Sequence, residues 1–524
     1  MNSTWIFNKN FLIFLTVLTF LTIYLIIKNA DYLPLDPFSD IYYHLTISSQ
    51  YLKLQQITTF NTWESLPWGH PQTYPPFFHV IISPLIKFFK FNLYTDKIVI
   101  AFSLILSGFL FSLGIFLIFR SYLISLLSFI ISFTHLYFLN IHSMTLPALL
   151  VFSLSPLLFF FVKNKKYVSF VVLLIFIFYT HRYLPYLIFG SIILWSFFYD
   201  KKSLIKNILL ILIAFVFYLP YLKENLKIGL NFYPYIGYSN IIQTAKTVFL
   251  FLPFDLLVIL SFLFKNNFNQ KDFNFFWILF IFLIPIWFFI PSRSSLASLR
   301  ILILSPLAIK GLLALFSQKK TLGILFLIWL LTISLNLKFS FNKLTLSIEK
   351  SLLFFGLQDK TINQQLQQFK EKMYYLAYLV KKFSNPEEPF YFKTENFYHF
   401  KINPRLERVP ANVISFFSQN PYLQRGVPEV FFYPEPDMNL AKIIILDQPI
   451  NNQKILLEKI ETDFQTFFVY LNPNYKKITL PSSKNFLPIQ IAYFLIILGL
   501  ILILIENYFQ KIYSLLKIKF NLFK

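Results

Sequence analysis

Residues 98–119 read IVIAFSLILSGFLFSLGIFLIF, a run of 22 positions without a charged side chain. A helix needs about 20 apolar residues to cross the hydrocarbon core of a bilayer. Comparable runs recur along the chain of 524 residues, which is 56% hydrophobic and only 14% charged. These runs predict a polytopic α-helical membrane protein.

We predict about twelve spans, each built on one such apolar run. They are 11–27, 98–119, 121–139, 146–162, 167–179, 183–199, 208–221, 248–264, 275–290, 301–316, 322–337 and 487–505. No small-residue cleavage site follows the first run, so we expect it to be retained as a helix rather than removed as a signal peptide. The absence of cysteine excludes disulfides, thiolate metal sites and cysteine nucleophiles.

Basic residues predict the orientation of these spans. The net charge is +23, and lysines cluster in the predicted inner loops, for example at 163–166. Cytoplasmic loops carry an excess of Lys and Arg, so the pattern predicts a multi-pass protein of the cell membrane with both termini in the cytoplasm. The charge is explained by this rule, and we therefore expect no nucleic-acid partner.

Three parts follow along the chain. Residues 1–338 form a multi-span module with a long first outer loop, 28–97, and residues 486–524 form the last span and a basic cytoplasmic tail. Residues 339–485 are richer in charge and predict a small extracytoplasmic α/β domain. In it we expect a helix at 359–383, strands at 442–446 and 467–471, and a helix at 452–464 between those strands.

The first outer loop also contains an ambiguous apolar segment, 76–89. A span there would reverse every later loop and place the basic cluster at 163–166 outside. The segment is short, and Lys87 and Lys90 lie at its end. We therefore expect an amphipathic helix on the outer surface.

The same loop gathers the ionisable residues that could carry chemistry, whereas the rest of the membrane-embedded chain is almost free of acidic residues. They are Asp31, Asp36, Asp40, Glu64, His44, His70 and His79. Carboxylates concentrated on one water-facing loop of an apolar protein indicate an active site at the membrane surface.

Two motifs in this loop resemble a known family. Residues 39–45 read SDIYYHL, and residues 74–79 read YPPFFH at the start of the expected surface helix. Their position after one N-terminal helix is similar to the GT-C superfamily of polyprenyl-phosphate-dependent glycosyltransferases, which includes oligosaccharyltransferases and protein mannosyltransferases. The resemblance covers the first seven spans and the outer C-terminal domain. It implies that Asp40 is catalytic, with Asp36 as second choice; alternatively, both only solvate the loop or cap a helix that starts near Ile41.

The chemistry of sugar transfer gives each candidate a role. A carboxylate within reach of the acceptor can remove its proton, and a single base attacking opposite the leaving group predicts inversion at the anomeric carbon. The departing phosphate needs cationic or hydrogen-bonding partners. The substrate-binding candidates are Tyr42, His44, His79, His181, Arg182, Arg293 and Arg300. The arginines have an alternative role as anchors to lipid headgroups.

Two departures from the oligosaccharyltransferase pattern narrow the expected activity. The next outer loop, 140–144, reads NIHSM and has no carboxylate. The ligands available to a divalent cation would be one Asp and His142, which is a poor donor set for a hard ion. No tryptophan follows Trp329, so the Trp-Trp-Asp motif expected for asparagine sequons is missing. We therefore expect no cofactor, with a divalent metal as the weaker alternative, and a hydroxyl acceptor on a lipid, a glycan or a protein.

Two other functional classes remain open. A transporter or flippase of lipid-linked sugars should show broken helices, midplane polar groups and related halves. This chain has 11 glycines and no visible repeat, which favours an enzyme. A scaffold whose outer domain binds a partner is the third alternative. The expected partners of the enzyme are a polyprenyl-phosphate sugar donor, the acceptor and membrane lipids.

Overall fold

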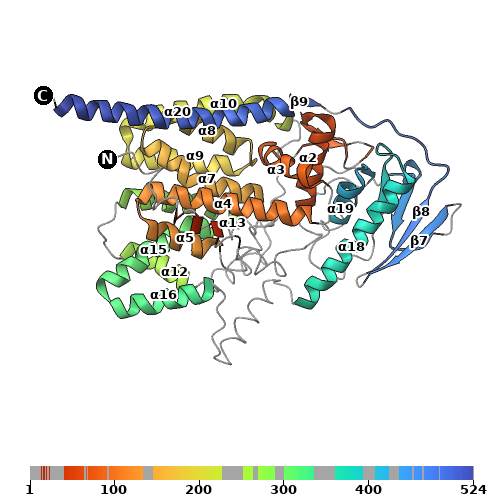
Figure 1. Ribbon diagram of the computed structural model, residues 1–524, viewed down its shortest axis with the longest axis horizontal. Coiled ribbons are helices and arrows are strands. Elements are labelled where there is room, and N and C mark those ends of the chain that lie inside the picture. Colours follow the sequence, from red (N-terminus) through yellow and green to blue (C-terminus); the bar gives the residue numbers. More distant parts are fainter. Residues whose placement is uncertain are drawn as a thin grey trace.

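The computed structural model places the apolar helices at one end of an elongated molecule and a β-sheet at the other (Figure 1). Helices α2, α3 and α19 lie between these two ends (Figure 1). The structure describes residues 13–14, 16–17, 19–20, 23, 41–63, 66–67, 69–72, 74–90, 94–133, 146–226, 252–263, 270–289, 300–334, 360–393, 408–423, 436–450, 454–462, 465–482 and 484–522.

Helices cover most of the described parts of the predicted spans. Five helices of the described residues contain stretches long and apolar enough to cross a membrane: α4 (Thr95–Phe119), α7 (Leu146–Lys163), α10 (Lys201–Leu226), α15 (Arg300–Gln318) and α20 (Ile489–Leu522). The other apolar helices are α5 (Tyr122–Phe133), α8 (Tyr167–Phe178), α9 (Leu184–Tyr199), α12 (Leu252–Leu263), α13 (Gln270–Phe289) and α16 (Lys320–Ser334). The described residues of 11–27 are also helical. The mostly helical class is confirmed, and the count of twelve spans stays a prediction.

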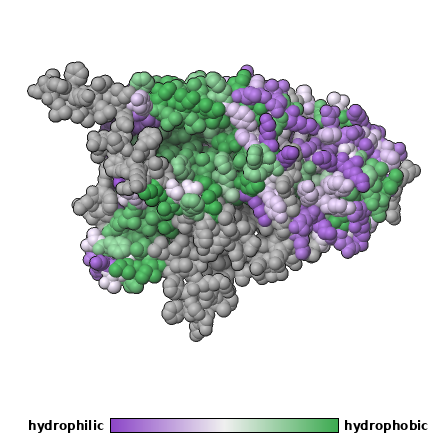
Figure 2. Space-filling view, viewed as in Figure 1, coloured by the Kyte–Doolittle hydropathy of each residue, from purple (hydrophilic) through white to green (hydrophobic). Residues whose placement is uncertain are grey.

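The surface of the helical end is apolar, whereas that of the sheet end is mostly hydrophilic (Figure 2). Helix α20 shows why: its apolar side chains point outward, and Phe494 and Leu504 are 61% and 67% exposed. Water would disfavour such a surface, whereas lipid tails solvate it. This distribution supports a membrane protein.

Helix α20 contacts α8 at two places along its length. At Gly499 the absence of a side chain lets α20 approach closely, because an added Cβ would lie 2.7 Å from the ring of Phe176. One end of the contact is polar. The Glu506 carboxylate accepts backbone N–H bonds from Val168 and Ser169, at 3.1 and 2.7 Å. Free N–H groups at a helix start favour such an acceptor, so the last helix caps α8.

The sheet end is a mixed α/β structure. Its five strands lie in the order β5-β4-β6-β8-β7. They are β4 (Phe390–Lys393), β5 (Tyr422–Leu423), β6 (Ile443–Leu446), β7 (Ile455–Glu461) and β8 (Thr466–Leu471); the associated helices are α18 (Lys360–Phe383), α19 (Arg408–Ser418) and the short 3₁₀ turn η5 (Met438–Leu440). Strand β4 is parallel to both β5 and β6, with α19 forming the crossover to β5. We call the described residues of 360–482 the C-terminal α/β region.

The predicted helix at 452–464 is wrong. Residues 455–461 form β7, which pairs antiparallel with β8 across a bulge between Leu456 and Glu458. Leu, Glu and Lys favour helix locally, and the bulge interrupts the alternation that marks a strand. Pairing with the free edge of β8 overrides this local preference.

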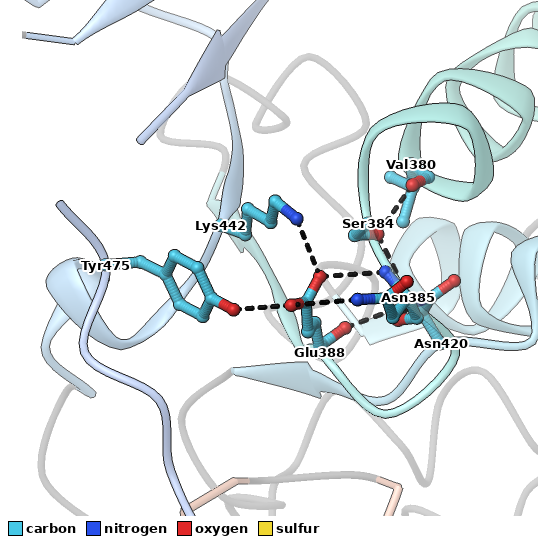
Figure 3. A network of polar contacts seen from close by, with 7 residues as sticks. All are labelled: Val380, Ser384, Asn385, Glu388, Asn420, Lys442 and Tyr475. Atoms are coloured by element: carbon cyan, nitrogen blue, oxygen red, sulfur yellow. Dashed lines mark hydrogen bonds and ion pairs between the residues drawn. The ribbon is translucent and has the colours of Figure 1, made fainter. Parts of the chain in front are cut away.

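A polar network ties the strands of this region to the end of α18 (Figure 3). The Glu388 carboxylate accepts from the Lys442 ammonium at 3.0 Å, from the Asn385 backbone N–H at 2.8 Å and from the Tyr475 hydroxyl. The Asn420 amide donates to the carbonyl oxygens of Asn385 and Glu388, at 2.6 and 3.0 Å. Because Glu388 is 8% exposed, these bonds replace the water that its charge would otherwise need.

The described part of segment 28–97, the predicted first outer loop, packs against both ends of the molecule. It contains α2 (Ile41–Leu54), β1 (Gln56–Thr58), β2 (Phe60–Asn61), β3 (His70–Pro71) and α3 (Phe77–Phe89). Strand β1 pairs antiparallel with β9 (Asn485–Pro488), which leads directly into α20. Leu66 forms a parallel bridge with Leu423 and sits in the core of the C-terminal α/β region. The expected helix at 76–89 is present as α3.

Candidate functional site

Helix α2 begins at Ile41, the residue directly after Asp40. Its residues are buried without interruption from Ile41 to Tyr51, although several are polar. Several of these polar groups are paired: the Ser48 hydroxyl donates to the His44 carbonyl at 2.8 Å, and the Gln50 amide nitrogen donates to Thr62 at 3.0 Å. A loop helix that is buried to this degree is fixed in position by its surroundings.

Several predicted site residues lie outside the described residues: Asp36, Asp40 and Arg293, as well as the loop at 140–144. Helix α15 begins at Arg300, whose side chain also lies outside them.

The structure brings His44 of α2 and His79 of α3 together. Nδ1 of His44 lies 2.9 Å from Nε2 of His79, and both rings are buried. Aromatic rings surround the pair, with Tyr74, Phe78 and Tyr43 centred 5.0, 5.3 and 5.4 Å from the His44 ring. Burial lowers the pKa of His79 to about 3, although the nearby Pro75 backbone opposes the shift. The His79 side chain is therefore neutral at physiological pH.

The turn between α8 and α9 reaches the same neighbourhood through Tyr74, whose ring is 6.2 Å from that of His181. Nδ1 of His181 accepts the backbone N–H groups of Tyr183 and Leu184, at 3.2 and 3.3 Å, and so caps the start of α9. The role of this histidine in the structure is therefore at least partly structural. Tyr221 of α10 contacts the same cluster, because its hydroxyl donates to the Tyr74 carbonyl oxygen at 2.7 Å.

Arg182 is the cation nearest in sequence to this cluster. It is partly exposed, and its guanidinium lies 5.2 Å from the centre of the Tyr183 ring. Among the described residues no acidic side chain is within ion-pair distance of it. An arginine without an acidic partner is available to bind an anion such as a phosphate.

Tyr42 is placed differently from the prediction of a substrate-binding residue. Its side chain is fully buried, and its hydroxyl donates to the Asp96 carboxylate at 3.0 Å. The same carboxylate accepts two bonds from the Lys370 ammonium, at 2.8 and 2.7 Å. Sequence reasoning missed Asp96 and Lys370. The only signal was an acidic residue at the start of an apolar run, at Asp96.

No group of three or more His, Asp or Glu side chains suited to a metal ion occurs among the described residues. The histidine pair contains no carboxylate, and its two facing nitrogens bond to each other. These residues fit a hydrogen-bonding role and do not form a donor set for a hard cation.

No protein-family model matches the sequence, and no curated protein matches it either. Solved structures do match. ArnT from Cupriavidus metallidurans bound to undecaprenyl phosphate is similar over 88% of this chain and 99% of that one, with a TM-score of 0.54 and 10% identity. Its apo state is similar over 82% and 93%, with a TM-score of 0.50 and 11% identity. The chain has a GT-C fold.

The oligosaccharyltransferase AglB from Archaeoglobus fulgidus, in complex with an inhibitory peptide and a dolichol-phosphate, also matches. The similarity covers 84% of this chain and 70% of that one, with a TM-score of 0.43 and 13% identity. ArnT and AglB are polyprenyl-phosphate-dependent glycosyltransferases of the GT-C superfamily. The similarity to ArnT confirms, at the level of the fold, the resemblance that the sequence motifs indicate.

Proposed function

We propose that this protein is an inverting glycosyltransferase that moves a sugar from a polyprenyl-phosphate donor to a hydroxyl acceptor. The observation that carries the proposal is the GT-C fold shared with ArnT bound to undecaprenyl phosphate, over 88% of this chain. One fold can host several activities, so the site must support the activity independently. That support is the buried helix α2, which begins directly after Asp40 and packs against α3 and against α19 of the C-terminal α/β region.

Asp40 is the proposed general base. Its carboxylate takes the proton of the acceptor hydroxyl while the acceptor oxygen bonds to the anomeric carbon of the sugar. The bond from that carbon to the phosphate oxygen breaks, and the phosphate leaves on its lipid with the bonding electrons. Attack opposite the leaving group inverts the anomeric centre. Asp36 is the second candidate for this role.

Arg182 is the proposed phosphate ligand from the described residues, because it is partly exposed and has no acidic partner there. Arg293 and Arg300 are further candidates for binding the same phosphate. His79 is neutral, so the pair that it forms with His44 would contribute hydrogen bonds and shape at the site. Charge that develops on the departing phosphate is stabilised by donors already in place.

The orientation of α8 supports an outer-face site in a cell-membrane protein. The lysines at 163–166 precede α8, whereas His181 and Arg182 follow it. A helix of 12 residues separates them by about 18 Å along its axis. If the lysine cluster faces the cytoplasm by the positive-inside rule, the site faces the opposite side.

The test compares surface glycans and lipid-linked sugars by mass spectrometry in cells that lack the protein and in cells given back a variant. The wild type should restore a glycan that deletion truncates by one sugar. Asp40→Asn should reach the membrane and fail to restore it, since a general base contributes about 10²–10⁴ in rate. Asp200→Asn, on the predicted inner side, is the matched control and should restore it.

Binding of undecaprenyl phosphate to the purified protein gives a second readout. Arg182→Gln should weaken this binding by roughly tenfold, the worth of one charge-assisted contact. Full activity of Asp40→Asn would rule out Asp40 as the base. Intact lipid-linked sugar accumulating on the inner side in deletion cells would instead indicate transport.

A further inference from the structure

Lys370 of α18 is a charged side chain with no exposed surface. Its ammonium contacts both oxygens of Asp96, at 2.8 and 2.7 Å, and Asp96 lies in the first turn of α4. Removing two charges from water is costly, and replacing such a pair by apolar residues is often neutral or stabilising. Stability alone therefore does not account for this ion pair.

The ion pair is joined to the start of α2 through Tyr42. The Tyr42 hydroxyl donates to Asp96 at 3.0 Å. Its ring also packs against two rings of α19, with centroids 6.0 Å from Phe416 and 5.9 Å from Phe417. The C-terminal α/β region thus holds Tyr42 in two ways. The rings of α19 pack against it, and Lys370 of α18 binds Asp96 of α4, which accepts the hydrogen bond from Tyr42.

We propose that Tyr42, Asp96 and Lys370 form a clamp by which the C-terminal α/β region sets the position of Asp40. The clamp residues are positioning residues, and the inference rests on the proposed function of Asp40. Tyr42 lies two residues beyond Asp40, so a rotation of the first turn of α2 would move the carboxylate with it. A displacement of about 1 Å at a reacting group can cost on the order of 10² in rate.

The hydrogen-bonded series Lys370–Asp96–Tyr42 can fix the start of α2 more closely than apolar packing would. Hydrogen bonds are directional, and an ammonium that contacts both carboxylate oxygens leaves Asp96 little freedom to turn. The carboxylate then presents a fixed acceptor to Tyr42. The outer domain predicted from sequence would, on this basis, be part of the catalytic machinery and not only an acceptor-binding module.

Tyr42→Phe tests the clamp most directly, because it removes one hydroxyl and leaves the ion pair intact. Glycan restoration per protein molecule in the membrane should fall roughly tenfold or more. Binding of undecaprenyl phosphate to the purified variant should stay within about twofold of the wild type, and its thermal unfolding midpoint should change little. A merely structural role would instead lower binding, midpoint and restoration together.

A second variant tests the ion pair without leaving a buried charge unpaired. Asp96→Asn/Lys370→Met removes both charges, so it should fold and reach the membrane, and restoration should fall as in Tyr42→Phe. Lys372→Met changes an exposed lysine of the same helix and is the matched control. It should restore the glycan as the wild type does.

The outcomes separate the clamp from the proposed function. Wild-type restoration by Tyr42→Phe, together with no restoration by Asp40→Asn, would overturn the clamp and keep the general base. Loss of undecaprenyl phosphate binding in Tyr42→Phe would overturn positioning in favour of a structural role. Full restoration by Asp40→Asn would overturn the proposed base, and the clamp with it.

Discussion

Nδ1 of His44 and Nε2 of His79 lie 2.9 Å apart in a box of aromatic rings. At this distance one nitrogen donates its proton and the other accepts it, so a second proton on the accepting nitrogen would break the bond. Burial lowers the pKa of His79 to about 3, against an ordinary value of 6.5. Between about pH 6.5 and 3, His79 therefore takes up a proton in the unfolded chain but not in the folded protein.

This difference predicts a pH dependence of stability. Between pH 6.5 and 3 the unfolded state binds more protons at His79 than the folded state does, so the free energy of unfolding should decrease as the pH falls. The slope is at most about 1.4 kcal/mol per pH unit. In His79→Phe the decrease between pH 6.5 and 5 should be smaller than in the wild type, as measured by thermal unfolding in detergent.

His79→Phe also leaves His44 without this partner, which should cost about 1–3 kcal/mol at every pH. That offset does not affect the comparison, because the prediction concerns the slope. Equal slopes for wild type and variant would show that His79 titrates in the folded protein as it does in the unfolded chain.

Long apolar runs made the helical end of the molecule predictable. Helix α4 coincides with the run at 98–119, because a continuous apolar surface leaves few alternatives to a helix in lipid. The strand β7 was not predictable in this way. Its local sequence favours a helix. The segment forms a strand because it pairs with the edge of β8, and this tertiary contact cannot be inferred from the local sequence.

The site could be predicted in part. The motifs pointed to His44 and His79, but not to their contact, since 35 residues separate them in the chain. Lys370 carried no signal at all, because it is one of several lysines on an amphipathic helix. Its burial follows from the way α18 meets α4, a tertiary arrangement that local periodicity does not encode.

Glu388 predicts a second pH dependence, in a more acidic range. Burial alone would raise the pKa of its carboxyl, but hydrogen bonds from Tyr475, from the Asn385 backbone and from Lys442 lower it to about 2, against an ordinary 4.5. The stabilisation from this network should be complete above about pH 4.5 and lost as the pH falls toward 2. Glu388→Gln should therefore be less stable than the wild type at neutral pH.

The same variant should show a weaker loss of stability between pH 4.5 and 2, because the shifted carboxyl is gone. Unfolding midpoints across this range measure the effect. Glu387→Gln is the matched control, since its side chain is the exposed neighbour of Glu388. A control that behaved like Glu388→Gln would attribute the effect to net charge instead of to the network.

Gly311 predicts a packing limit where α15 meets α12. A Cβ added there would lie 1.9 Å from the carbonyl oxygen of Leu257 and 2.8 Å from its carbonyl carbon. Alanine favours a helix over glycine by about 1 kcal/mol, which alone would stabilise the variant. The clash involves backbone atoms, so no rotamer change relieves it and the helices must separate. Overpacking of this kind costs about 1–3 kcal/mol or more.

We therefore expect Gly311→Ala to lower the free energy of unfolding, measured by denaturant titration in mild detergent. Gly190→Ala is the matched control in α9, because the added Cβ would meet only the Phe282 ring, at 3.2 Å. That ring can shift, so the gain in helix propensity should largely offset the contact. If Gly311→Ala were as stable as Gly190→Ala, α12 and α15 would have to lie farther apart than their carbonyl contact requires.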